Sequence, residues 1–185
     1  MTTALVPGSL GALAKLNNQT LAESFLTADH IILLDRSYSM TERDAPGGRT
    51  RYQMACDELA RLQESLPGKI ALVSFDSMTS FVPGGMPEPP GSSTDLTRAL
   101  EFVKPADGTV SFVLISDGYP DNPLTALTIA RGFASKINVV YCGPETDRVG
   151  RQFLSELAQV SGGKYLESLR TANLGESVTK LLKSG

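Results

Sequence analysis

The sequence contains little cysteine and little histidine, and both shortages exclude classes of protein. Its two cysteines, Cys56 and Cys142, are too few for the disulfide framework of a small secreted domain. Both lie in apolar patterns, so we expect two free, buried thiols. Because His30 is the single histidine, the chain also lacks the nitrogen and sulfur ligands that a zinc site needs.

Long hydrophobic runs and a strong net charge are also missing. No apolar run approaches the roughly 20 residues that cross a bilayer, so no membrane span is predicted. The net charge of −3 argues against general nucleic-acid binding. The amino-terminal residues do not form a positive cluster followed by a compact apolar segment, so we predict no secretory signal and a cytoplasmic location.

Apolar strands alternate with amphipathic helices along the chain, which predicts βαβ units. We expect an α/β fold with a doubly wound, mostly parallel central sheet, one short antiparallel edge strand and helices on both faces. Residues 1–28 are interpreted as an N-terminal extension with a helix packed on the edge, and residues 29–185 as the domain. In such a sheet, ligands bind at the carboxyl ends of the strands, where the strand order reverses.

The predicted strands are short apolar runs, and the predicted helices have apolar residues at helical spacing. The strands are Ile31–Leu34, Ile70–Phe75, Thr79–Val82, Val110–Ile115, Ile137–Cys142 and Tyr165–Leu166. The helices are Leu10–Phe25, Tyr52–Leu66, Asp95–Val103, Leu124–Ser135, Arg148–Val160 and Leu174–Leu182.

Two of these strands end next to an aspartate, Asp35 in one case and Asp117 in the other. Adjacent parallel strands would bring both carboxylates into one crevice, where they would repel unless a cation or proton lay between them. Ser37 and Ser39 follow at alternate positions, and in an extended turn their hydroxyls would project to one side. Thr94, where a loop enters a helix, could add a third hydroxyl. Such oxygen ligands suit Mg²⁺ or Mn²⁺.

Each of these residues also has an ordinary structural interpretation. The two serines could cap a turn, and Thr94 could be the N-cap of its helix. Asp117 could begin a common Asp-Gly turn. His30 lies at the entrance of the strand that Asp35 follows, so we interpret it as structural. As an ordered set, however, D-x-S-x-S, then T-D-L, then S-D-G favours a binding site.

This ordered set resembles the metal-ion-dependent adhesion site of von Willebrand factor type A (VWA) domains. The resemblance extends from Ile31 to about Leu182. It implies that the two serines and the threonine bind Mg²⁺ or Mn²⁺ directly, while the two aspartates act through water. The positions that match the family's metal site are Asp35, Ser37, Ser39, Thr94 and Asp117.

The resemblance further implies a protein-interaction module. Because hydroxyl ligands are neutral, the ion would keep its positive charge, and a partner's Asp or Glu carboxylate would complete its coordination. The resemblance implies a stand-alone prokaryotic or phage member, and stand-alone cytosolic members are often partners of AAA+ ATPases or of other complexes. In the family, the metal site can switch between ligand states with movement of the C-terminal helix, which here would be Leu174–Leu182. Integrin β subunits share the D-x-S-Y-S-M form and bind a second ion through two acids, whereas this chain has Glu42 and Arg43 there.

The rim of the crevice would select the partner. We expect Arg36, Tyr38 and Tyr119 to border it, and the two tyrosines are either interface anchors or local packing. The Pro83–Pro90 loop, the Arg43 to Arg51 loop and the segment from Tyr119 to Asn122 are expected there too. A segment with three arginines, Arg43 to Arg51, has no interleaved aromatic residues and is interpreted as a solvated loop.

The alternative interpretation is a Mg²⁺-dependent phosphoryl-transfer or hydrolytic enzyme that uses the strand-end aspartates. Such enzymes have a second acid two residues after the first, where this chain has Ser37. No glycine pair is followed by a P-loop pattern, and a serine hydrolase would need His30, at the wrong end of its strand. We therefore predict that the protein is not an enzyme.

Overall fold

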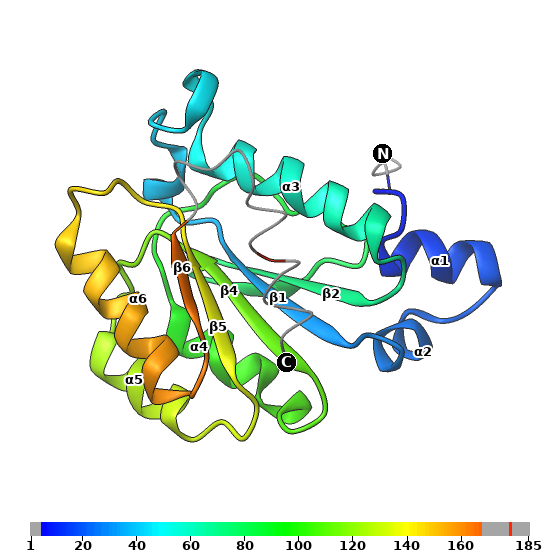
Figure 1. Cartoon of the computed structure of the whole chain (residues 1–185). Helices are drawn as coiled ribbons and strands as arrows, with labels where there is room; N and C mark the ends of the chain where they lie inside the picture. The colour runs from blue at the N-terminus through cyan, green and yellow to red at the C-terminus, as the bar shows by residue number, and fades with distance from the viewer. Residues whose placement is uncertain (1–4, 168–177, 179–185) are drawn as a thin grey trace.

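A six-stranded sheet forms the centre of the protein in a computed structural model that describes residues 5–167 and Val178 (Figure 1). The strand order is β3-β2-β1-β4-β5-β6, and every neighbouring pair is parallel except β2 with β3. The predicted fold class is therefore confirmed. The strands are β1 (His30–Asp35), β2 (Ile70–Phe75), β3 (Thr79–Phe81), β4 (Ser111–Ser116), β5 (Ile137–Tyr141) and β6 (Tyr165–Glu167).

Helices cover both faces of this sheet. The α-helices are α1 (Leu10–Asn17), α2 (Leu21–Leu26), α3 (Arg51–Ser65), α4 (Leu96–Val103), α5 (Pro123–Arg131) and α6 (Arg148–Val160). Of these, α3 lies on one face, and α4, α5 and α6 lie on the other (Figure 1). The short 3₁₀ helices are η1 (Tyr38–Thr41), η2 (Pro46–Gly48) and η3 (Lys104–Ala106).

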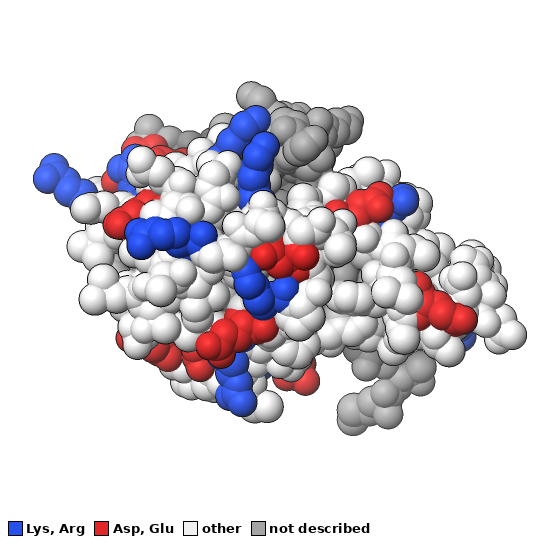
Figure 2. Space-filling view, turned by 90° about the horizontal axis from the view of Figure 1, so that it is seen from below, with Lys and Arg blue, Asp and Glu red and all other residues white. Residues whose placement is uncertain are grey.

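No helix in the described ranges is both long and apolar enough to cross a membrane. Figure 2 shows the molecule from below, where acidic and basic side chains are interspersed among uncharged surface.

The central strands are buried on both faces, which explains their continuous apolar runs. In β1, Ile31 and Leu33 pack with α4, α5 and α6. Ile32 and Leu34 instead pack with α3, because successive strand residues point to opposite faces. Val178 is buried on the α3 side, while the rest of the predicted helix from 174 to 182 lies outside the described residues. The prediction of free, buried cysteines is confirmed.

The strand order reverses between β1 and β4. From β1 the chain moves outward to β2 and β3, returns to the other side of β1 as β4, and continues to β5 and β6. Leu34 pairs with Ile115, so Asp35 and Ser116 end adjacent strands at the same level. The polar residues that follow therefore leave the sheet at the switch point, where α/β folds bind ligands.

The first helical segment differs from the single helix predicted for Leu10–Phe25. Asn18 adopts the left-handed conformation with φ 55° and ends α1. Thr20 and Glu23 then form a capping box that starts α2. The prediction was wrong because apolar spacing continued across both helices and hid these stop and start signals. The domain boundary after residue 28 stays a prediction.

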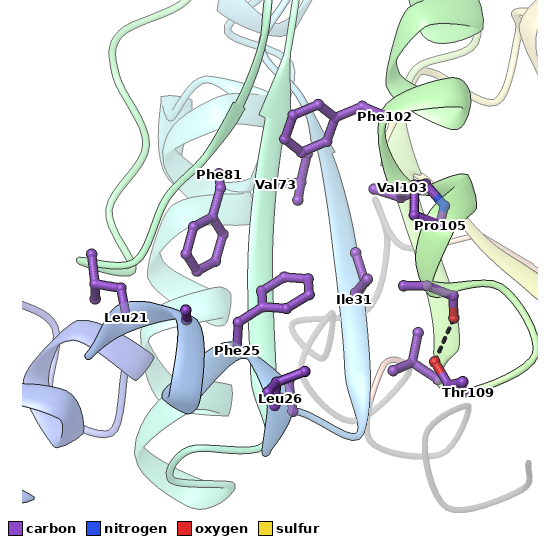
Figure 3. Close-up of a pocket in the computed structure, with 14 residues that line it drawn as sticks. Leu21, Phe25, Leu26, Ile31, Val73, Phe81, Phe102, Val103, Pro105 and Thr109 are labelled. Carbon is purple, nitrogen blue, oxygen red and sulfur yellow. Dashed lines mark hydrogen bonds between the residues drawn. The ribbon is translucent and has the colours of Figure 1, made fainter. Parts of the chain in front are cut away.

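An apolar hollow of about 830 Å³ lies between α2 and η3, toward the amino ends of β1 and β4 (Figure 3). The rings of Phe25 and Phe81 meet edge to face there, with centroids 5.2 Å apart. Leu26, on the hollow's rim, is 84% exposed. Among the described lining residues, Thr109 has the one polar side chain, and its hydroxyl donates a hydrogen bond to the Ala106 carbonyl at 2.7 Å. The lining side chains therefore offer a ligand apolar contact rather than hydrogen bonds.

Candidate functional site

Asp35 ends β1 with a fully buried side chain. Its Oδ1 accepts a hydrogen bond from the Ser37 N–H at 2.8 Å, and its Oδ2 accepts one from the Ser116 hydroxyl at 2.6 Å. Burial, and then the nearby charge of Asp117, raise the pKa of Asp35 to about 7. The hydrogen bonds thus offset only part of the cost of burying this carboxylate, and a nearby cation would reduce it further.

The two serines after Asp35 lie close together, but not in the extended turn that the sequence predicted. Ser37 directly precedes the tight 3₁₀ helix η1, and Ser39 lies inside it. This turn brings the two hydroxyl oxygens to 3.1 Å from each other. The Ser39 hydroxyl also donates a hydrogen bond to Asp117 Oδ1 at 3.0 Å. Because Ser37 makes no capping hydrogen bond to η1, the capping interpretation fails for it.

Thr94 lies in a loop at the carboxyl edge of the sheet. Hydrogen bonds hold this loop to both neighbouring segments. Its N–H donates to Asp121 Oδ1 at 3.2 Å, and its carbonyl accepts from the Asp121 N–H at 3.0 Å. Earlier in the loop, the Gly91 N–H donates to the Arg36 carbonyl at 2.7 Å. Asp95, and not Thr94, is the N-cap of α4. The Thr94 hydroxyl is therefore not used for capping.

Arg51 is a buried member of this site, and the sequence interpretation missed its burial and its ion pair with Asp117. We predicted that Arg43 to Arg51 form a solvated loop on the rim of the crevice, but Arg51 begins α3 and is only 6% exposed. Its guanidinium donates to Asp117 Oδ2 at 2.8 Å and to the two Asp44 oxygens at 2.9 and 2.5 Å. Burial acts to lower the pKa of Arg51, but these hydrogen bonds raise it overall. The capping box of Thr50 and Gln53 was the available signal, since it places Arg51 in the first turn of α3.

Arg36 also lies below the surface, although we predicted it on the rim. Its Nη2 is 3.1 Å from Asp76 Oδ2, and its Nη1 donates to the Pro89 carbonyl at 2.9 Å. Gly91 packs directly against this pair, because a Cβ atom there would lie 1.7 Å from Asp76 Oδ2. The buried ion pair therefore fixes the loop that carries Thr94.

The two tyrosines predicted for the rim are both exposed. Tyr38 lies on η1, and Tyr119 follows β4 shortly after Asp117. The Tyr119 hydroxyl donates to Asp147 Oδ1 at 2.5 Å, and this bond raises the pKa of Tyr119 to about 12. Tyr119 is therefore held in place by α6, since Asp147 is the N-cap of that helix.

The separation of the two serine hydroxyl oxygens fits a hard divalent cation. In an octahedron with bonds of about 2.1 Å, neighbouring ligands lie roughly 3 Å apart. The Ser37 and Ser39 hydroxyl oxygens, 3.1 Å apart, match that spacing. Within residues 5–167 and at 178, no group of three or more His, Cys, Asp and Glu side chains could hold a metal ion. A metal at this edge would therefore need the hydroxyl groups as ligands.

No protein-family model matches the sequence, and no curated protein matches it. Solved structures match the fold. BatB of Bacteroides thetaiotaomicron aligns with a TM-score of 0.62 and 15% identity, over 85% of this chain and 98% of that one. The manganese-loaded TRAP protein of Plasmodium vivax aligns with a TM-score of 0.59 and 15% identity, over 85% and 73%. A von Willebrand factor type A protein of Catenulispora acidiphila aligns with a TM-score of 0.57 and 15% identity, over 83% and 41%.

The chain has the VWA fold. This confirms the fold that the resemblance of the strand-end residues implied. At 15% identity, the likeness concerns the fold alone, so the function must be argued from the side chains at the carboxyl edge of the sheet.

Proposed function

We propose that the protein is a protein-binding module that depends on Mg²⁺ or Mn²⁺. Ser37, Ser39 and Thr94 would hold the ion directly, with Asp35 and Asp117 acting through water. The observation that carries this proposal is the pair of serine hydroxyl oxygens 3.1 Å apart, beside two buried carboxylates. When bound, the ion would supply a positive charge that attracts an Asp or Glu carboxylate of a partner protein.

The existing hydrogen bonds support hydroxyl rather than carboxylate ligands. Both Asp35 oxygens already accept hydrogen bonds within the protein, as do both Asp117 oxygens. The serine hydroxyls, in contrast, can turn their lone pairs toward an ion while they donate their protons to neighbouring acceptors. A site of neutral direct ligands would leave most of the ion's charge for the partner's acid.

The surroundings of the site support a protein partner. Tyr38 and Tyr119 are exposed beside it, and tyrosine is enriched at the centres of interfaces. The mixture of acidic and basic groups in Figure 2 gives no support to nucleic-acid binding. The manganese of the TRAP structure supports Mn²⁺ as a ligand of the same fold. An AAA+ ATPase or other complex subunit as partner, and a cytoplasmic location, stay predictions.

We propose no catalytic activity. A phosphoryl-transfer enzyme of the alternative class would need an acid two residues after Asp35, where Ser37 lies. His30 begins β1, at the opposite end from Asp35, and its Nδ1 lies 2.6 Å from the Ser111 hydroxyl. It is therefore too far along the strand to act as a general base at the site.

Calorimetric titration with Mn²⁺ tests the proposal. Wild type should give a heat of Mn²⁺ binding, and Ser37→Ala and Asp35→Ala should give none. The control Ser155→Ala, on the exposed side of α6, should bind Mn²⁺ as wild type does. Equal binding by all four proteins would remove the site assignment. The same samples should not hydrolyse a generic phosphatase substrate, and Mn²⁺-dependent hydrolysis lost in Asp35→Ala would favour the enzyme.

A further inference from the structure

Arg51 places a buried positive charge directly against the proposed metal site. Its Nη1 donates to Asp117 Oδ2 at 2.8 Å, while the Ser39 hydroxyl donates to Oδ1 of the same carboxylate at 3.0 Å. Nη1 also lies 3.4 Å from the Ser39 carbonyl oxygen. Arg51 and a proposed metal ligand therefore share one carboxylate.

The charge of Arg51 is permanent, because a guanidinium is not deprotonated in proteins. Little water screens it, since the side chain is 8% exposed and that of Asp117 is 1% exposed. In the metal-free protein, this charge offsets that of Asp117, which would otherwise lie unpaired near the buried Asp35. When a dication enters the same site, the same charge repels it.

We infer that Arg51 is a built-in counter-ion that stabilises the metal-free site and weakens its binding of divalent cations. The inference rests on the proposed function and adds to it the residue that sets the metal affinity. The second partner of Arg51 is Asp44, whose side chain is 35% exposed and lies on the outer side of the guanidinium. Asp44 holds Arg51 in place and partly compensates for its charge.

The test compares the Mn²⁺ dissociation constants of wild type and Arg51→Met, a change that keeps an unbranched side chain and removes the charge. We expect the dissociation constant to fall by about tenfold, because a dication loses a repelling charge at close range. The midpoint of thermal unfolding in EDTA should fall as well, because Asp117 loses its counter-ion. Mn²⁺ binding that is unchanged or weaker in Arg51→Met overturns the inference.

Arg49→Met is the matched control. It makes the same change in net charge two residues away, but the Arg49 side chain is 43% exposed and pairs with Asp57 on α3. The Mn²⁺ dissociation constant of Arg49→Met should stay within about twofold of the wild-type value, since charges in contact with solvent are screened by water and salt. An equal gain in affinity in both variants would mean that net charge alone acts, and would overturn the assignment to Arg51.

A second variant keeps the inference falsifiable if Arg51→Met does not fold. Asp44→Asn retains the Arg51 charge and removes the compensating carboxylate, so Mn²⁺ binding should weaken by about threefold or more. Unchanged or tighter binding in Asp44→Asn overturns the inference. If wild type binds Mn²⁺ and Arg51→Met binds equally, only this inference fails. If neither wild type nor Arg51→Met binds, the proposed function fails with it.

Discussion

The two ends of the sheet differ in how their side chains are used. Near the amino ends of β1 and β4, a hollow of about 830 Å³ is lined almost entirely by apolar groups. At the carboxyl ends of the same strands, Asp35 and Asp117 are buried within a network of hydrogen bonds and an ion pair. The hollow offers only apolar contact, whereas the carboxyl edge has the oxygen atoms and charges that recognise an ion. Side-chain chemistry therefore distinguishes the two ends of the sheet.

The two ends also differ in energetic cost. Burying apolar groups around the hollow stabilises the fold without electrostatic cost. At the carboxyl edge, the raised pKa of Asp35 reports that its ionised form is destabilised by burial and by Asp117. Groups with such perturbed pKa values concentrate at functional sites. The comparison predicts that changes at the edge alter metal binding and changes around the hollow alter only stability.

The largest expected effect comes from removing both serine hydroxyls. Mn²⁺ at 100 times its dissociation constant should stabilise wild type by about 2.7 kcal/mol. The double variant Ser37→Ala with Ser39→Ala should show no such gain in thermal unfolding. Phe102→Ser, half-exposed at the hollow, should keep the gain in full. If Mn²⁺ still stabilises the double variant, the assignment of metal binding to the carboxyl edge is wrong.

The next largest effect is expected from Gly91→Ala. The added Cβ would lie 1.7 Å from Asp76 Oδ2, which the Arg36 ion pair holds in place. Urea unfolding should show a loss of about 2 kcal/mol from this overpacking. Gly84→Ala is the control, since its nearest neighbour would be a flexible Leu5 side-chain atom at 3.4 Å. Equal stability of the two variants would contradict a rigid Thr94 loop.

At the hollow, Phe25→Ala should lower the free energy of unfolding by about 1.5 to 2 kcal/mol, less than the loss expected for a fully buried phenylalanine. The change removes the edge-to-face contact with Phe81. Leu26→Ala, at a side chain that is 84% exposed, should change it by less than about 0.5 kcal/mol. Both variants should bind Mn²⁺ as wild type does, and altered binding in Phe25→Ala would show that the two ends are coupled.

The smallest expected effect depends on pH. Burial acts to raise the pKa of Asp107, but hydrogen bonds from Lys104 and from the Ser135 and Ala134 N–H groups lower it to about 2. A carboxyl with a lowered pKa stabilises the folded state above its unfolded value near 3.8, and this contribution is lost as the pH falls toward 2.

Asp107→Asn should therefore be less stable than wild type by about 1 kcal/mol at pH 7, and the difference should shrink between pH 4 and pH 2. Chemical unfolding at several pH values would measure it. Asp29→Asn, whose exposed carboxylate pairs with Lys69, should have little effect at any of them. A difference for Asp107→Asn that stays constant with pH would refute the assigned pKa.

The fold was predictable because apolar runs and helical spacing are local signals, and the sheet buries both faces as those runs require. The site was predictable for the same reason, because an aspartate directly after a predicted strand is also a local signal. The break at Asn18 was missed because a single left-handed residue interrupts a helix without changing its apolar spacing. The relation of Arg51 to Asp117 was missed because the two lie 66 positions apart and meet only when α3 docks on the sheet. Local patterns show which residues lie near strand ends, but not which distant side chains neutralise them.

The most direct test of the central claim is the anomalous difference density of manganese in crystals grown with Mn²⁺. The account predicts a peak about 2.1 Å from the hydroxyl oxygens of Ser37 and Ser39, at the distance of an oxygen ligand. A peak elsewhere, or one in contact with the Asp35 or Asp117 carboxylates but with neither serine, would contradict it.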